Sequence, residues 1–133
     1  MSKSKNSTTN NQEIPRIFIT TAKVLQIISP KLTTLFAAKL FTTPIKYKIP
    51  KRELHMDKES KQKTILIPTI KKEVIAYEYG QSSKKILLVH GWSGRGTQLV
   101  KIADELIKNG YMTISFDAPA HGKSKGNFSI MTE

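Results

Sequence analysis

Three short stretches of this chain contain the residue types that catalysis most often uses. They read "HGWSGRG" (90–96), "DAPAH" (117–121) and "GKSKG" (122–126). The third stretch fits two patterns at once, because Gly-x-Ser-x-Gly is the sequence of a nucleophile elbow and Gly-Lys-Ser is the end of a phosphate-binding P-loop. The residues around each stretch decide which of these chemistries is available.

The P-loop pattern is not completed. It needs a glycine five residues before the Gly-Lys-Ser, so that the backbone can wrap around the phosphates. That position holds Asp117, whose carboxylate repels phosphate, and Pro119 removes an N–H that the loop needs. No helical stripe follows in 127–133 to present a positive N-terminus. We therefore do not expect a nucleotide site here.

The nucleophile elbow also lacks its context, which is a sharp turn directly between a buried strand and a helix. Ser124 lies seven residues past Asp117, where the preceding apolar strand has ended, and no helix clearly follows it. Ser93 does precede a helix, but by several residues, and the closing glycine is not at the required place. Neither serine is expected to be a nucleophile.

The segment that positions these stretches has the pattern of a mixed α/β fold. "TILIPTI" (64–70) and "EVIAYEY" (73–79) predict two paired strands, and Pro68 places the first at a sheet edge because proline cannot donate to a ladder. "KILLV" (85–89) is apolar throughout, which is typical of a strand buried on both faces.

The next elements complete a parallel unit. An amphipathic helix over 97–109 ends at Gly110 and is followed by a strand over 111–116. A strand, a helix and a second strand predict a right-handed crossover with parallel strands. The loops 90–98 and 117–127 leave the carboxyl ends of these two strands, where ligands bind in such sheets.

These two loops resemble a known family. "ILLVHGWSGRGTQL", followed after one helix by "FDAPAHGKS", is similar to the N-terminal half of an α/β-hydrolase, in particular to bacterial members with such loops. The resemblance covers 63–133. It implies the N-terminal part of the α/β-hydrolase sheet, with an antiparallel hairpin followed by a β-α-β unit. It also implies a serine hydrolase of ester or related acyl bonds, acting on a small-molecule acyl substrate without cofactor or metal.

The resemblance assigns one residue of the oxyanion hole and several loop residues. The backbone N–H of Trp92 is the expected donor, whereas on the alternative interpretation the loop's glycines only allow a tight turn and Trp92 is a packing aromatic. Arg95 is expected to brace the loop or be solvated, with an anionic substrate group as the alternative partner. Neither histidine of the loops matches the catalytic one, which comes late in the family. The residues expected to shape the loops are His90, Gly91, Gly94, Gly96, Asp117, Pro119, His121, Gly122 and Ser124.

The family's nucleophile, acid and histidine come after a fifth strand, so the resemblance places them beyond Glu133. The chain is thus expected to be a partial hydrolase and to be inactive alone. The alternative is a non-catalytic binding or membrane-associated module that retains a hydrolase-like remnant. Oligomeric state is left open by the sequence.

The N-terminal half differs in composition from the rest. Residues 1–13 are polar and expected to be a disordered tail, 14–42 a helical extension interrupted at Ser29-Pro30, and 43–62 a charged linker. Lys39 lies within the apolar stripe of the second helix. We expect this extension to dock on the protein, with peripheral membrane contact through 14–42 as the alternative. His55 is given no role.

The charge and composition exclude some classes of function. The formal net charge is +12, and residues 1–72 carry 15 Lys/Arg against 4 Asp/Glu. The lysines lack the aromatic residues and recognition helix of nucleic-acid binders, so no nucleic acid is expected. With no cysteine, thiolate chemistry and disulfides are excluded. The chain has no secretory pattern and is interpreted as cytoplasmic, or peripheral on the inner membrane face.

Overall fold

The computed structural model of the chain describes residues 15–130. The chain divides into two compact units, residues 1–39 and 40–133, which are described separately. The tail expected at 1–13 lies outside the described residues.

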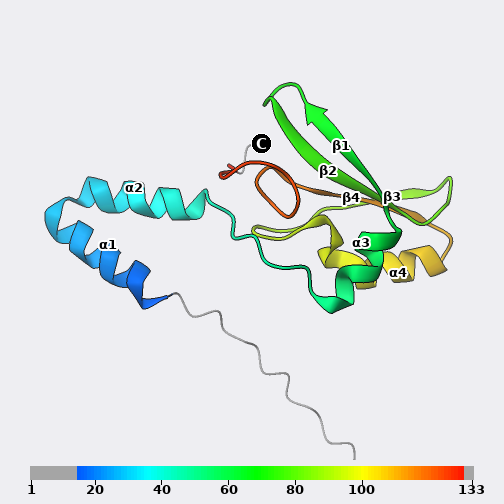
Figure 1. The fold of residues 1–133 in the computed structure, drawn as a ribbon, viewed down its shortest axis with the longest axis horizontal. Coiled ribbons are helices and arrows are strands. Elements are labelled where there is room, and N and C mark those ends of the chain that lie inside the picture. The colour runs from blue at the N-terminus through cyan, green and yellow to red at the C-terminus, as the bar shows by residue number, and fades with distance from the viewer. Residues whose placement is uncertain (1–14, 131–133) are drawn as a thin grey trace, which may run out of the picture. The chain divides into compact units, whose positions relative to one another are not determined.

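The N-terminal helices are α1 (Arg16–Ile28) and α2 (Pro30–Phe41) (Figure 1). All of α1 belongs to the first unit, whereas α2 begins in the first unit and its last two residues belong to the second. Ser29 lies between them with extended backbone, and its N–H donates to the carbonyl of Leu25 at 2.8 Å. Pro30 then takes the first position of α2, where its missing N–H costs no hydrogen bond. The segment expected to be a helical extension thus contains two helices that are separated at Ser29. Neither helix buries a side chain.

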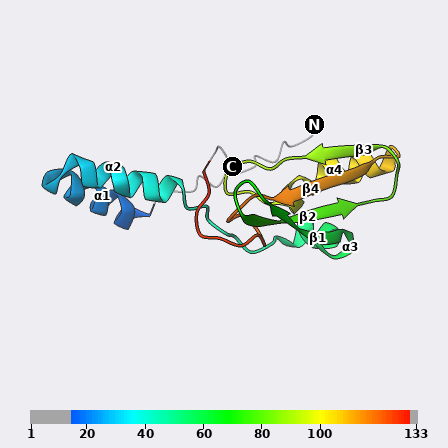
Figure 2. The ribbon, with the colours of Figure 1, turned by 90° about the horizontal axis from the view of Figure 1, so that it is seen from above.

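The second unit is built on a four-stranded sheet with the strand order β1-β2-β4-β3 (Figures 1 and 2). β1 pairs antiparallel with β2, β2 pairs antiparallel with β4, and β3 runs parallel to β4. The strands are β1 (Lys61–Ile67), β2 (Lys72–Tyr79), β3 (Lys85–Leu88) and β4 (Met112–Asp117). The predicted hairpin and parallel pair are confirmed, and β1 lies at an edge, with Pro68 directly after its last residue.

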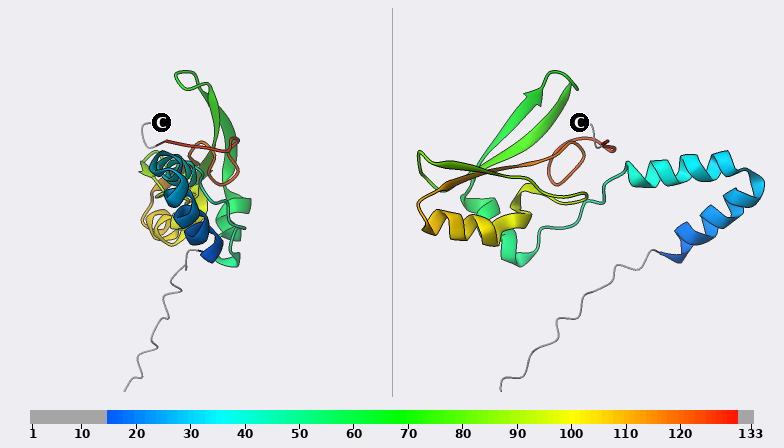
Figure 3. Two further views of the ribbon diagram at one scale, coloured as in Figure 1. Left: turned by 90° about the vertical axis from the view of Figure 1, so that its left-hand side faces the viewer. Right: turned by 180° about the vertical axis from the view of Figure 1, so that it is seen from behind.

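The crossover between the parallel strands contains η2 (Gly96–Leu99) and α4 (Val100–Lys108). Gly110 follows α4 with a φ of +81°, a conformation that glycine adopts without strain. The hydrophobic core consists of Met56, Tyr79, Val100 and Ala103, with Leu88 and Ile107 packed against it. These residues bring α3 and α4 onto the same face of the sheet (Figure 3).

The segment 43–62, expected to be a linker, is folded over most of its second half. It contains η1 (Lys51–Glu53) and α3 (Leu54–Glu59), and β1 begins at Lys61. Met56 is fully buried in the core, which anchors α3 to the sheet. His55 is not merely solvated, because its Nε2 lies 3.1 Å from a carboxylate oxygen of Asp104 on α4. The linker composition did not reveal these contacts because they are made by residues distant in sequence.

The expectation that 85–89 is buried on both faces is wrong for the described residues. Leu87 is 60% exposed and Val89 is 58% exposed. Within residues 15–130, β3 pairs with β4 alone and α4 covers one face of the sheet. The apolar side chains of β3 on the face away from α4, such as Leu87, therefore have no covering layer within residues 15–130.

Candidate active site

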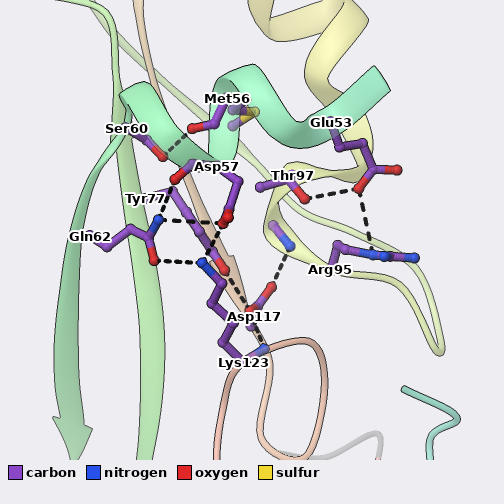
Figure 4. A network of polar contacts seen from close by, with 11 residues as sticks. Glu53, Met56, Asp57, Ser60, Gln62, Tyr77, Arg95, Thr97, Asp117 and Lys123 are labelled. Atoms are coloured by element: carbon purple, nitrogen blue, oxygen red, sulfur yellow. Dashed lines mark hydrogen bonds and ion pairs between the residues drawn. The ribbon is translucent and has the colours of Figure 1, made fainter. Parts of the chain in front are cut away.

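The loops after β3 and β4 are held together by the carboxylate of Asp117, which is fully buried at the end of β4. Its Oδ1 accepts a hydrogen bond from the backbone N–H of Gly96 at 2.6 Å. Its Oδ2 accepts from the Tyr77 hydroxyl at 2.8 Å and from the backbone N–H of Lys123 at 2.7 Å. Figure 4 shows these contacts converging from two loops and β2. One side chain thus fixes both loops against the sheet.

Tyr77 can act only as the donor in this arrangement. Burial raises the pKa of its phenol, and the neighbouring Asp117 carboxylate raises it further, so the hydroxyl keeps its proton at any physiological pH. Because Asp117 accepts three hydrogen bonds, the charge of its carboxylate is compensated without a cation.

Two glycines permit the close approach of backbone to these groups. A Cβ on Gly96 would lie 2.7 Å from a ring carbon of Tyr77, which is too near for any side chain. Gly122 has a φ of +44°, and a Cβ there would collide with the carboxyl group of Asp117. Gly91 is different, because nothing lies within 4 Å of the position its Cβ would take.

The stretch after β3 forms a tight turn around Trp92 and Ser93. The N–H of Gly94 donates to the carbonyl of Gly91 at 2.9 Å, and Ser93 has a φ of +54°. The four residues form a β-turn with Trp92 in its second position. Among residues 15–130, the backbone N–H of Trp92 has no hydrogen-bond acceptor.

His90 joins the two loops as a neutral imidazole. Its Nε2 lies 3.1 Å from the backbone nitrogen of Ala118, and that N–H can only donate, so Nε2 is the acceptor. Its Nδ1 then carries the proton and donates to the carbonyl of Gly91 at 2.7 Å. Both ring nitrogens are therefore occupied by main-chain groups.

His121 leaves one ring nitrogen without a partner. The side chain is 3% exposed, and its Nδ1 donates to the carbonyl of Pro119 at 2.9 Å. Burial lowers the pKa of the imidazole, so the neutral form prevails. Its Nε2 is a buried acceptor with no hydrogen-bond donor among residues 15–130. The rings of Trp92 and His121 pack edge to face, with their centroids 5.1 Å apart.

Ser124 is 1% exposed and fully engaged. Its Oγ accepts from the N–H of Ile75 at 2.9 Å and donates to the carbonyl of Asp117 at 2.6 Å. These bonds link the edge of β2 to the end of β4, where the pairing of the two strands stops at Ile75 and Asp117. An attacking hydroxyl must be exposed and next to a base, and Ser124 has neither property.

A segment that the sequence interpretation assigned partly to the linker also lies on these loops. We call residues 41–48 the strap. The N–H of Ile45 donates to the Oγ of Ser93 at 3.2 Å, and the Nζ of Lys46 donates to the carbonyl of Ser124 at 2.6 Å. The ring of Phe41 stacks on Trp92 with centroids 5.5 Å apart. No spacing in 41–48 predicts these contacts.

Arg95 secures the end of the strap and pairs with Glu53, which follows the strap in sequence. An Nη of Arg95 donates to the carbonyl of Lys48 at 3.0 Å, and its Nε lies 3.6 Å from Glu53. The fully buried carboxylate of Glu53 also accepts from the Thr97 hydroxyl at 2.9 Å (Figure 4). Arg95 thus contacts residues of the protein itself and is only 12% exposed.

Lys123 provides a further anchor from the loop after β4. Its Nζ pairs with the carboxylate of Asp57 on α3 and donates to Oε1 of Gln62 at 3.1 Å (Figure 4). The "GKSKG" stretch is therefore a structural junction around Asp117, from which Lys123 reaches Asp57 and Gln62 and Ser124 reaches Ile75.

Residues 15–130 show neither a metal-binding cluster nor a membrane-spanning helix. Residues 15–130 contain no group of three or more His, Cys, Asp or Glu side chains placed to hold a metal ion. None of the helices in that range is both long and apolar enough to cross a bilayer.

Comparison with known proteins shows the fold of this unit. No protein-family model and no curated protein matches the chain. A Pyrococcus furiosus esterase, solved in two crystal forms, is 22% identical with TM-scores of 0.52 and 0.50. These matches cover 68% and 66% of this chain and 35% of the esterase. A bromoperoxidase from Bacillus anthracis is 25% identical over 52% of this chain and 25% of its own, with a TM-score of 0.45.

The chain spans about a third of the length of the esterase it matches. The sheet unit has the fold of the N-terminal part of an α/β-hydrolase, as the sequence predicts.

Proposed function

We propose that the protein is an α/β-hydrolase that cleaves ester or related acyl bonds through a nucleophilic serine. In this proposal the described residues supply half of the oxyanion hole and the floor of the substrate crevice. The nucleophile, acid and catalytic histidine are proposed to come from residues after Glu133. The substrate is a small-molecule acyl compound.

The observation that carries the proposal is the backbone N–H of Trp92, which has no hydrogen-bond acceptor among residues 15–130 and lies in a hydrogen-bonded turn. The turn is closed by Gly94 and Gly91, and it is tied to the sheet through Gly96 and Asp117. A fixed N–H directed at a developing oxyanion stabilises the transition state by about 3 kcal/mol. Since the loop is already held in place, little reorganisation is required when the oxyanion forms.

The proposal also accounts for the engagement of His90, Asp117 and Ser124. His90 and Asp117 have main-chain partners on both loops, and Ser124 joins β2 to the end of β4, so none of the three is available as a base or nucleophile. Their contribution is to position the loops, and the reacting groups must come from elsewhere in the protein.

The first test is the reading frame that encodes this chain. We expect it to continue into a Gly-x-Ser-x-Gly between a strand and a helix, and labelling by a fluorophosphonate probe should disappear when that serine is changed to alanine. A frame without such an elbow would remove the enzymatic proposal and leave a non-catalytic module with a hydrolase-like scaffold.

The second test separates the N–H of Trp92 from its indole ring. Trp92→Pro deletes the N–H at the second position of a β-turn, where proline is favoured, whereas Trp92→Ala keeps the N–H and removes the ring. With the complete reading frame, kcat/KM for a p-nitrophenyl ester should fall about 100-fold in Trp92→Pro relative to Trp92→Ala. Equal activity of the two variants would exclude this N–H as the oxyanion donor.

A further inference from the structure

We propose that residues 16–48 bind the surface of an anionic lipid membrane. This inference is independent of the proposed hydrolase activity, because it rests on the exposed side chains and charges of α1, α2 and the strap.

The first observation is an exposed apolar face on α1. Ile17, Val24 and Ile28 are 70%, 50% and 67% exposed. They are separated by seven and four residues, so they share one face of the helix. Three large aliphatic side chains on one solvent-exposed face are unfavourable in water unless another apolar phase covers them.

The same character continues along the chain through α2 and into the strap. Leu35 on α2 is 66% exposed, and Phe41 at its end is 59% exposed. Within the strap, Ile45 is 59% exposed and Tyr47 is 45% exposed. The strap belongs to the sheet unit and is fixed by hydrogen bonds to Ser93 and Arg95, so its exposed side chains are held in place.

The second observation is the charge of this segment. It carries six basic residues and no acidic residue, since the acidic residues nearest to it are Glu13 and Glu53. The basic residues are Arg16, Lys23, Lys31, Lys39, Lys46 and Lys48, of which Lys46 donates to the carbonyl of Ser124. Long basic side chains beside apolar ones suit a lipid interface, because the aliphatic stems lie among the acyl chains while the charged ends reach the headgroups.

The charge also decides between a membrane and a second copy of the chain. A symmetric dimer through this surface would bring two sets of six positive charges together with no acidic partner within the segment. An anionic bilayer supplies the opposite charge and an apolar phase at the same time. The surface potential of such a bilayer attracts each nearby lysine with an energy equivalent to about a fivefold increase in affinity.

The helices are too short to span a bilayer and would lie along its surface. α1 has 13 residues and α2 has 12, so each is about 20 Å long. A hydrocarbon core is about 30 Å thick. An interfacial position places the apolar face of each helix at the boundary between headgroups and acyl chains.

Vesicle flotation tests this proposal directly. We expect the chain to float with vesicles of phosphatidylcholine containing 30% phosphatidylglycerol, and to float far less with pure phosphatidylcholine or in 0.5 M NaCl. Lys23→Glu, Lys31→Glu and Lys48→Glu combined should weaken binding on the order of 100-fold. The matched control reverses three exposed lysines of the sheet unit, Lys58→Glu, Lys71→Glu and Lys101→Glu, and should bind almost as the parent chain does.

A second variant tests the apolar contribution. Ile17→Gln, Val24→Gln and Ile28→Gln combined keep the charge and helix propensity but should reduce vesicle binding at least tenfold. Absence of flotation with anionic vesicles, or equal loss in the two lysine triples, would overturn the proposal. So would a stable dimer by light scattering that the glutamine triple converts to monomer, because that outcome assigns the apolar face to a second copy.

Discussion

The backbone N–H of Gly96 donates a 2.6 Å hydrogen bond to Oδ1 of Asp117, although the two residues are 21 positions apart. Gly96 begins η2 in the loop after β3, and Asp117 is the last residue of β4. The conformation of the turn around Trp92 therefore depends on a carboxylate from the other loop. Substitutions at either residue should alter both loops together.

The carboxylate of Asp117 is expected to dominate the stability of this junction. Asp117→Asn replaces one acceptor oxygen by an NH₂ group that faces N–H or O–H donors, and should cost about 3 kcal/mol of unfolding free energy. Tyr77→Phe removes only one of the three donors and should cost about 1 kcal/mol. Urea denaturation followed by the fluorescence of Trp92, the only tryptophan, measures both. Equal effects of the two changes would contradict this ranking.

Two glycines of the same loop should respond differently to alanine. Gly96→Ala places a Cβ 2.7 Å from the Tyr77 ring, and the repacking should cost about 2 kcal/mol. Gly91→Ala meets nothing within 4 Å, so its cost should stay below about 0.5 kcal/mol. Thermal unfolding by circular dichroism compares the variants. A lower melting temperature for Gly91→Ala than for Gly96→Ala would be the contrary result.

His121 should make the fold sensitive to mild acid. Burial lowers the pKa of its imidazole below the ordinary value of 6.5, so the unfolded chain binds a proton more readily than the folded one. Stability is then complete above about pH 6.5 and falls as the pH drops toward the lower pKa of the folded state. His121→Phe should flatten the dependence of the urea midpoint on pH between 7.5 and 5.0. An unchanged slope would assign the acid sensitivity to other groups.

The strap should loosen when Arg95 is shortened. Arg95→Met removes the hydrogen bonds to the carbonyls of Tyr47 and Lys48, so trypsin should cleave after Lys46 and Lys48 several times faster. Arg52→Met is the matched control, because the Arg52 side chain is 63% exposed and pairs with Glu53 at 3.4 Å without reaching the strap among the interactions of residues 15–130. Mass spectrometry of the early fragments gives the cleavage rates. Similar rates in both variants would mean that Arg95 does not fix the strap.

The sheet could be predicted because its signals are local. The apolar runs at 73–79 and 85–89, the amphipathic helix before Gly110 and the strand at 111–116 each carry their own periodicity, and the crossover rule fixes the parallel pairing. The position of Asp117 at the end of β4 follows from the same pattern. The structure adds the three donors that meet its carboxylate.

The short helices and the strap could not be predicted, because their stability comes from contacts distant in sequence. α3 has only six residues, too few to be stable alone, and it is held by the burial of Met56 and by the Lys123 to Asp57 pair. From the sequence, Glu53 is expected to be a solvated charge in a linker. In the structure it contacts Thr97 and Arg95, which are more than 40 positions away. The ring contact between Phe41 and Trp92 likewise joins residues that no local pattern relates.

Because β3 pairs with one neighbouring strand among residues 15–130, the exchange rates of its amide hydrogens can show whether another strand binds to its free edge. In a parallel strand, successive N–H groups point to opposite sides, and β3 has β4 on one side only within residues 15–130. Hydrogen exchange along Lys85–Leu88 should therefore alternate between slow and fast amides. Docking of another strand would slow the fast set and leave the slow set unchanged, so the periodicity of exchange itself reports whether this sheet has been extended.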